Sequence, residues 1–402
     1  MKSGASAARP MSGDGATSAD AAKTDAPAAG HPWYDPLGVF TKTPPPPEAK
    51  PTPVTYEAAA RLGYTPTWTG FATVQKGARL MDMEFVGGLI LAHDTRSAFT
   101  ALSPVSGDVR WTHLEGEPLS SFKGSAAAGK NLYLCDDSRL FIVDADTGQP
   151  VTDARSGSPI KQTFALIAST PPISAGSMLV MGSGSGRAFA HVPGYGASAG
   201  AGGGGVTAWQ YLIGKSIMAE PLVLENGLVA FVSVDGKVVL LNLSTGTAAG
   251  KATVFGGIVA TPAAGDGRIY VVSQDQSIYA FDDQNCGGLW RVRTESQLIM
   301  SPTFDEGKVY VQVPAAGLVA LDAGTGRQAW ASPDVKGRVI ARRKNTLITW
   351  DGTTAVSVEA SSGAVVERVE MPGVMDVRAE TFRDGNLYVV WPTGQISKLA
   401  PK

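Results

Sequence analysis

The chain has 402 residues, of which 44% are hydrophobic and 17% charged, and its formal net charge is -2. This length and composition suffice for a large core, and the near-neutral charge makes DNA or RNA an unexpected partner. The sequence contains no run of about 20 apolar residues of the kind that spans a membrane as a helix.

The N-terminal residues 1–55 differ in composition from the rest. They are rich in Ala, Gly, Ser, Asp and Pro, so we expect a disordered arm, followed by one folded domain over residues 56–402. Trp33, Tyr34 and Phe40 are concentrated in an otherwise polar stretch of this arm. This motif either packs on the folded domain, the interpretation we favour, or docks on a partner.

A repeat with a period close to 40 residues begins after this arm. One apolar position per copy gives Ile90, Leu132, Leu179, Val229, Ile269, Val309, Leu347 and Leu387, with successive spacings between 38 and 50. Before the first copy, residues 64–74 form a spare strand that contains Trp68. The period and the strand-turn-strand pattern predict four strands per unit, as in a propeller blade.

The best-preserved unit runs from Lys308 to Trp330. Two strands rich in β-branched and aromatic residues flank a short turn, and a second turn over Asp322–Gly326 leads to an outer strand with Trp330. Similar turns recur in other copies, and Asp282–Gly287 has one residue more. We interpret the carboxylates of these turns as turn formers and not as metal ligands.

This pattern resembles the pyrroloquinoline-quinone (PQQ)-type propeller repeat, which is also the repeat of BamB-like proteins. The resemblance is clearest over residues 262–290 and 302–330. It implies an all-β, eight-bladed propeller in which residues 64–74 supply the missing fourth strand of the last blade and close the ring. A seven-bladed ring is the alternative, if the irregular third copy does not form a complete blade.

The resemblance implies a non-catalytic scaffold for protein–protein contacts. Two alternatives stay open: a quinone-dependent dehydrogenase and a propeller that senses a small ligand or carbohydrate. Many quinone enzymes with this repeat use adjacent cysteines and a calcium ion. Here Cys135 and Cys286 lie in different copies, and we expect two free, buried thiols. We therefore expect no cofactor, and PQQ with calcium is not supported by the residues.

Two departures from the repeat are candidate contact surfaces. The third copy is longer than its neighbours, and the excess falls in the glycine-rich stretch 187–205, where His191, Pro193 and Tyr195 offer a candidate interaction loop. Arg342, Arg343 and Lys344 form a basic turn, which we interpret as a solvated turn in preference to a binding site.

The compartment is not fixed by the sequence. Residues 3–29 contain no apolar segment typical of a signal peptide, and the arm contains no cysteine for a lipid anchor, although proteins with this repeat are often periplasmic or attached to the cell envelope. We expect a monomeric propeller whose partner is a protein of unknown identity.

Overall fold

The computed structural model describes residues 54–114, 121–154, 156–194 and 205–402. Residues 1–48 and 49–402 form two separate units, and the propeller belongs to the second. The arm motif with Trp33, Tyr34 and Phe40 lies outside the described residues.

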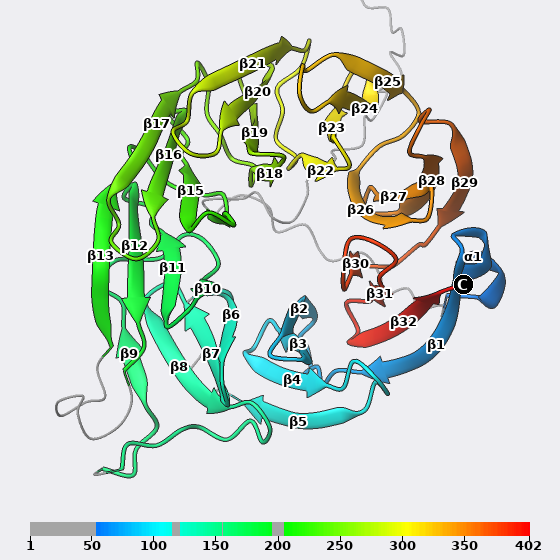
Figure 1. The fold of residues 1–402 in the computed structure, drawn as a ribbon. Coiled ribbons are helices and arrows are strands. Elements are labelled where there is room, and N and C mark those ends of the chain that lie inside the picture. Colours follow the sequence, from blue (N-terminus) through cyan, green and yellow to red (C-terminus); the bar gives the residue numbers. More distant parts are fainter. Residues whose placement is uncertain (1–53, 115–120, 155, 195–204) are drawn as a thin grey trace, which may run out of the picture. The chain divides into compact units, whose positions relative to one another are not determined.

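The described residues of the second unit form a ring of eight four-stranded antiparallel sheets, which confirms the predicted eight-bladed propeller (Figure 1). In seven blades the chain runs from the innermost strand to the outermost strand. The third copy is a complete blade, so the seven-bladed alternative is wrong. One short helix, α1 (Tyr56–Arg61), precedes the first strand.

The strands are given blade by blade, each time from the innermost strand outward. Blades one to four consist of β2 (Leu80–Val86), β3 (Leu89–Asp94), β4 (Ala98–Leu102) and β5 (Val109–Leu114); β6 (Phe122–Ala128), β7 (Asn131–Asp136), β8 (Arg139–Asp144) and β9 (Lys161–Thr163); β10 (Ile173–Ala175), β11 (Met178–Gly182), β12 (Arg187–Val192) and β13 (Val206–Leu212); and β14 (Leu222–Val223), β15 (Leu228–Val232), β16 (Lys237–Asn242) and β17 (Ala248–Thr253). Blades five to eight consist of β18 (Ala263–Gly265), β19 (Arg268–Ser273), β20 (Ser277–Asp282) and β21 (Gly288–Arg293); β22 (Thr303–Asp305), β23 (Lys308–Val313), β24 (Gly317–Asp322) and β25 (Gln328–Ser332); β26 (Arg338–Arg343), β27 (Thr346–Trp350), β28 (Thr354–Glu359) and β29 (Val365–Glu370); and β30 (Asp376–Ala379), β31 (Leu387–Val390), β32 (Gln395–Pro401) and β1 (Tyr64–Phe71).

The ring closes between the two ends of the domain, as predicted. Strand β1 pairs with β32 from Tyr64 opposite Pro401 to Phe71 opposite Gln395, and so becomes the outermost strand of blade eight. This pairing covers the outer edge of β32, which would otherwise be free to pair with another chain.

The hydrophobic core lies between successive blades. Val180 and Ala188 of blade three, for example, share one cluster of buried side chains with Phe231 and Val239 of blade four. The two middle strands of each blade are the most buried because a neighbouring blade covers each of their faces.

Five junctions between blades share one contact, in which a tryptophan of one outermost strand packs on a glycine turn of the next blade. The five indole Nε1 atoms donate to backbone carbonyls of these turns at 2.8–3.3 Å; the tryptophans are Trp68, Trp111, Trp209, Trp290 and Trp330. The turn glycine beneath the ring has a positive φ, and a Cβ on Gly246 would lie 2.6 Å from the Trp209 ring. The turns that the sequence predicts therefore also hold neighbouring blades together.

At the junction of blades four and five, other residues take the place of the tryptophan and the glycine. Cys286, with φ 61°, donates its N–H to the Asp282 carbonyl at 3.0 Å, as the turn glycines do in other blades. The prediction of an extra residue in this turn is therefore wrong, because Cys286 occupies the glycine position. Gly250 of β17 occupies the tryptophan position of the preceding blade, and a Cβ there would clash with the Asn285 backbone. The free thiol of Cys286 is buried here and that of Cys135 is buried in β7, as predicted.

Antiparallel strands give the ring two different faces. The turns that join the first strand to the second, and the third to the fourth, open on one face, which we call the hairpin rim. The turns that join the second strand to the third lie on the opposite face, together with the connections that lead to the next blade. We call this face the crossover rim.

Candidate protein-interaction surface

The first residues of the predicted interaction loop, 187–192, form β12, which ends on the hairpin rim. His191 is 1% exposed, and its Nε2 lies 3.0 Å from Oε1 of Gln162. Burial lowers the pKa of His191 to about 4. The expectation that His191 offers a contact surface is therefore wrong. Pro193 is half-buried, and Tyr195 lies outside the described residues, so a role for the remaining loop stays a prediction.

The predicted basic turn also lies on the hairpin rim, but its interpretation as a solvated turn is wrong for Arg342 and Arg343, whose side chains are mostly buried in ion pairs. Arg342 contacts Asp305 and Glu306, and Arg343 contacts Asp384 at 2.6 Å. The hydrogen bond from Arg343 holds the pKa of Asp384 below its usual range. These ion pairs join blades six, seven and eight, so the two arginines act as links between blades.

A second charged cluster lies on the innermost strands where the ring closes. Arg378 of β30 contacts Asp376 at 2.9 Å and Asp82 of β2 at 2.5 Å, and it donates to the Met83 carbonyl. Sequence reasoning missed this cluster because its members do not repeat between blades and are brought together only by ring closure.

Glu84 extends this cluster towards blade two. Its carboxylate accepts hydrogen bonds from the backbone N–H and the hydroxyl of Ser125 in β6. Burial raises the pKa of Glu84 to about 7, although these hydrogen bonds lower it. A carboxyl group that titrates near neutral pH therefore joins two neighbouring blades.

Four connections of the crossover rim are built alike, over residues 164–172, 213–221, 254–262 and 294–302. In the last three, an aliphatic residue is buried and its N–H donates to a serine carbonyl of the preceding blade at 3.2–3.3 Å; these residues are Ile217, Ile258 and Leu298. The residue that follows each of them is more exposed. These residues are Met218, which is 37% exposed, Val259, which is half-buried, and Ile299, which is 59% exposed.

Phe255 and Ile167 add to this row, with 84% and 69% of their surface exposed. The guanidinium of Arg291 lies over the Phe255 ring at 5.1 Å and over the Tyr279 ring at 5.2 Å. Arg291 also donates to the Ser277 hydroxyl at 2.9 Å, which fixes its position. We call Ile167, Met218, Phe255, Val259 and Ile299 the apolar arc. Sequence reasoning missed it because apolar residue types alone do not distinguish Ile217, which is buried, from Met218 beside it.

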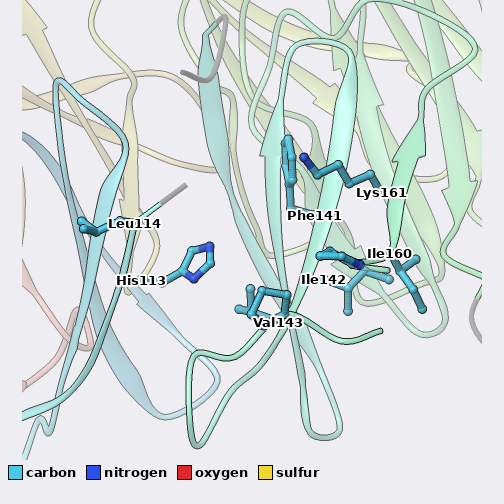
Figure 2. Close-up of a pocket in the computed structure, with 9 residues that line it drawn as sticks. His113, Leu114, Phe141, Ile142, Val143, Ile160 and Lys161 are labelled. Carbon is cyan, nitrogen blue, oxygen red and sulfur yellow. The ribbon is translucent and has the colours of Figure 1, made fainter. Parts of the chain in front are cut away.

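A small cleft of about 190 Å³ opens between blades one and two (Figure 2). Most of its lining is apolar, from Leu114 of β5, Phe141 of β8 and Ile160, and His113 and Lys161 add polar groups. Its volume is below the range of about 300–1,000 Å³ that is typical of sites for drug-sized ligands.

The other predicted features can be placed within the part of the chain that is described. Over these residues, no group of three or more His, Cys, Asp or Glu side chains is placed to hold a metal ion. His93 lies in β3, where burial lowers its pKa to about 4. Across the same residues, no helix has both the length and the apolar character needed to cross a membrane.

The fold and its repeating turns define the class of the protein: an eight-bladed propeller built from PQQ-like repeats. The sequence profile of the family described as outer membrane protein assembly factor BamB matches residues 68–249, 197–287 and 287–381. The chain therefore belongs to the BamB family. It is also similar to the outer membrane protein assembly factor BamB of Nitrosomonas eutropha, with 27% identity over 128 residues, which are 32% of this chain and 31% of that protein.

Solved structures share the fold. The crystal structure of BamB from Moraxella catarrhalis superposes with a TM-score of 0.63 and 18% identity, covering 84% of this chain and 97% of that one. The computationally designed Ika8 protein superposes with a TM-score of 0.57 and 12% identity, covering 80% of this chain and 96% of that one.

Proposed function

We propose that this propeller is a non-catalytic scaffold that binds a protein partner through the apolar arc on its crossover rim. The observation that carries the proposal is that exposed apolar side chains lie in four successive connections of one rim. Exposed apolar side chains that gather on one face of a soluble protein are typical of sites that bind another protein.

Phe255 has the properties of an interface anchor. Its ring is 84% exposed, so a partner can cover most of its surface. Ser277 and Tyr279 already hold Arg291 in place against the ring, so this side chain loses little conformational entropy when a partner binds. Aromatic and arginine side chains in this arrangement often dominate the binding energy of an interface.

The connections that carry the arc are held in place by the ring. In the connections of Met218, Val259 and Ile299, the buried residue before the arc residue donates its N–H to the preceding blade, as Ile217 donates to Ser183 and Ile258 to Ser233. The spacing of these arc residues is therefore set by the spacing of the blades. A partner would recognise this fixed row by its shape.

The relatives are described as outer membrane protein assembly factors. A component of that assembly process is therefore the first partner class to test. We propose that no cofactor takes part and that a single ring is the working unit.

The test uses the full-length chain, crosslinked in its native cell and captured for quantitative mass spectrometry. Phe255→Asp and Ile299→Asp place a charge in the arc, and Val105→Asp is the matched control because Val105 is 82% exposed on the hairpin rim. We expect a partner that wild-type protein and the control capture equally and that the arc variants lose. With the purified partner, loss of the Phe255 anchor should weaken binding about 30-fold, as for an interface hot spot.

Equal capture by all variants would contradict a role for the arc. If deletion of residues 193–205 abolished capture instead, the predicted interaction loop would hold the partner site. Absorbance titration with PQQ and Ca²⁺ tests the cofactor proposal, and a calcium-dependent spectral change with dye-linked oxidation of an alcohol or sugar would overturn it.

A further inference from the structure

The outermost strand of each blade has one edge that no strand of its own blade covers. Such an edge presents unpaired N–H and C=O groups, and proteins usually protect it with charged residues, proline or short length, because it can pair with another chain. The outermost strands of this ring can be compared on these three features.

Most of them carry at least one protecting feature. Strands β5, β17, β21 and β29 contain exposed charged residues, which are Arg110, Lys251, Arg291, Arg293, Arg368 and Glu370. Strand β1 contains Pro66 with a shift in register. Strand β9 covers Lys161–Thr163, and β25 exposes little beyond its first two residues.

Strand β13, Val206–Leu212, contains no charged residue and no proline and is seven residues long, although a register shift between Thr207 and Trp209 interrupts its pairing with β12. It reads VTAWQYL, without charge or proline, and its exposed positions are Val206, Ala208, Gln210 and Leu212. Val206 is 62% exposed and Leu212 is 57% exposed. In the position of Gln210, one residue after the tryptophan, β21 has Arg291.

The strand is paired on its inner side. It pairs with β12 from Arg187 opposite Leu212 to Val192 opposite Val206. Trp209 is 8% exposed and donates to the Leu243 carbonyl at 2.8 Å. An incoming strand would therefore meet a preformed edge (Figure 1).

We propose that the outer edge of β13 docks an extended segment of a partner polypeptide, which adds a fifth strand to blade three. The segment that fits is uncharged in its centre, because the edge itself is uncharged, and has apolar side chains at every second position, which can pack on Val206 on one face of the sheet or on Leu212 on the other. Backbone hydrogen bonds supply most of the attraction, so many sequences of this pattern would bind. This surface is separate from the apolar arc.

The test uses a defined probe, the peptide acetyl-KTVTVTVTK-amide, and the purified full-length protein. Binding is followed by the fluorescence anisotropy of labelled peptide, and its location by amide hydrogen exchange. We expect saturable binding below about 1 mM and slower exchange over residues 206–212. The same peptide with proline at its central position should not bind, because proline removes a donor and disrupts strand pairing.

Variants place the site. Gln210→Lys and, independently, Leu212→Glu should weaken binding at least about tenfold. Thr112→Lys places the same charge in the equivalent position of β5 and should leave binding unchanged. Phe255→Asp should also leave it unchanged, which separates this inference from the proposed function. Equal binding by wild type and both β13 variants, protection confined to other strands, or no saturable binding would each overturn the proposal.

Discussion

The tryptophan–glycine junctions permit a quantitative test. Gly246 has φ +68°, and a Cβ placed on it would lie 2.6 Å from the Trp209 ring. A left-handed backbone costs a residue with a Cβ about 1–2 kcal/mol. The methyl group must also displace an indole whose Nε1 is bonded to Leu243, and overpacking of this kind costs about 1–3 kcal/mol. The Gly246→Ala variant should therefore lose about 2–5 kcal/mol of unfolding free energy.

Gly267 supplies a control with the same backbone but no neighbour. Its φ is +71°, and a Cβ there would have no other atom within 4 Å. The Gly267→Ala variant should lose the backbone term alone, about 1–2 kcal/mol. The unfolding midpoint in urea, measured by tryptophan fluorescence and circular dichroism together, compares the two variants.

A double-mutant cycle then isolates the contact. In a Trp209→Leu background the indole is absent, and the cost of Gly246→Ala should fall to that of Gly267→Ala. If Gly246→Ala and Gly267→Ala lost equal unfolding free energy in the wild-type background, the reasoning would be refuted, because the Trp209 indole could then move aside at no energetic cost.

Three further predictions concern buried groups. The folded-state pKa of Glu84, about 7, lies above its ordinary value near 4.5, so the stability that its protonated form contributes is complete below pH 4.5 and is lost as the pH rises to 7. The difference in unfolding free energy between wild type and Glu84→Gln should therefore change over that pH range by on the order of 2–4 kcal/mol. Parallel pH profiles of unfolding free energy for the two proteins would contradict this prediction. Arg378→Met removes the ion pair to Asp82 across the ring closure and should destabilise the propeller by about 2–4 kcal/mol in urea unfolding. The double variant Arg378→Met/Asp82→Asn should recover part of this loss, because no unpaired carboxylate remains at Asp82. Burial raises the pKa of Cys286 to about 12 and that of Cys135 well above its usual value. A thiol reagent at pH 8 should therefore label neither cysteine in the folded protein and both cysteines in urea. Fast labelling of the native protein would contradict this and would show that the junctions between blades open.

Much of this architecture could be predicted because it depends on local chemistry that repeats. Each turn needs a short polar residue at its start and a residue with positive φ at its end, and both are visible in one copy of the sequence. The closing strand could be identified because Trp68 lies where the other outer-strand tryptophans lie. The number of blades followed from the eight copies of the repeat, and this closing strand completed the last copy.

The interaction surfaces could not be predicted in the same way. Whether an aliphatic residue on the crossover rim is buried or exposed depends on which of two neighbours turns inward, as with Ile258 and Val259. The sequence pattern also gave a wrong prediction for His191, because the glycine-rich stretch suggested an exposed loop where β12 in fact continues to Val192. In each case the burial of a side chain depends on a neighbouring blade.

The exceptions to the tryptophan contact follow an order of their own. They lie at the junctions of blades two and three, four and five, and seven and eight. At the last of these, Glu367 of β29 is bound by Arg61 of α1 at 2.8 Å. No two of these junctions are adjacent, so every blade keeps at least one tryptophan–glycine contact with a neighbour. A blade is held mainly by its two neighbours, so this distribution gives each blade at least one strong link to the ring. Blade three, which has the longest copy of the repeat, follows one of these exceptions.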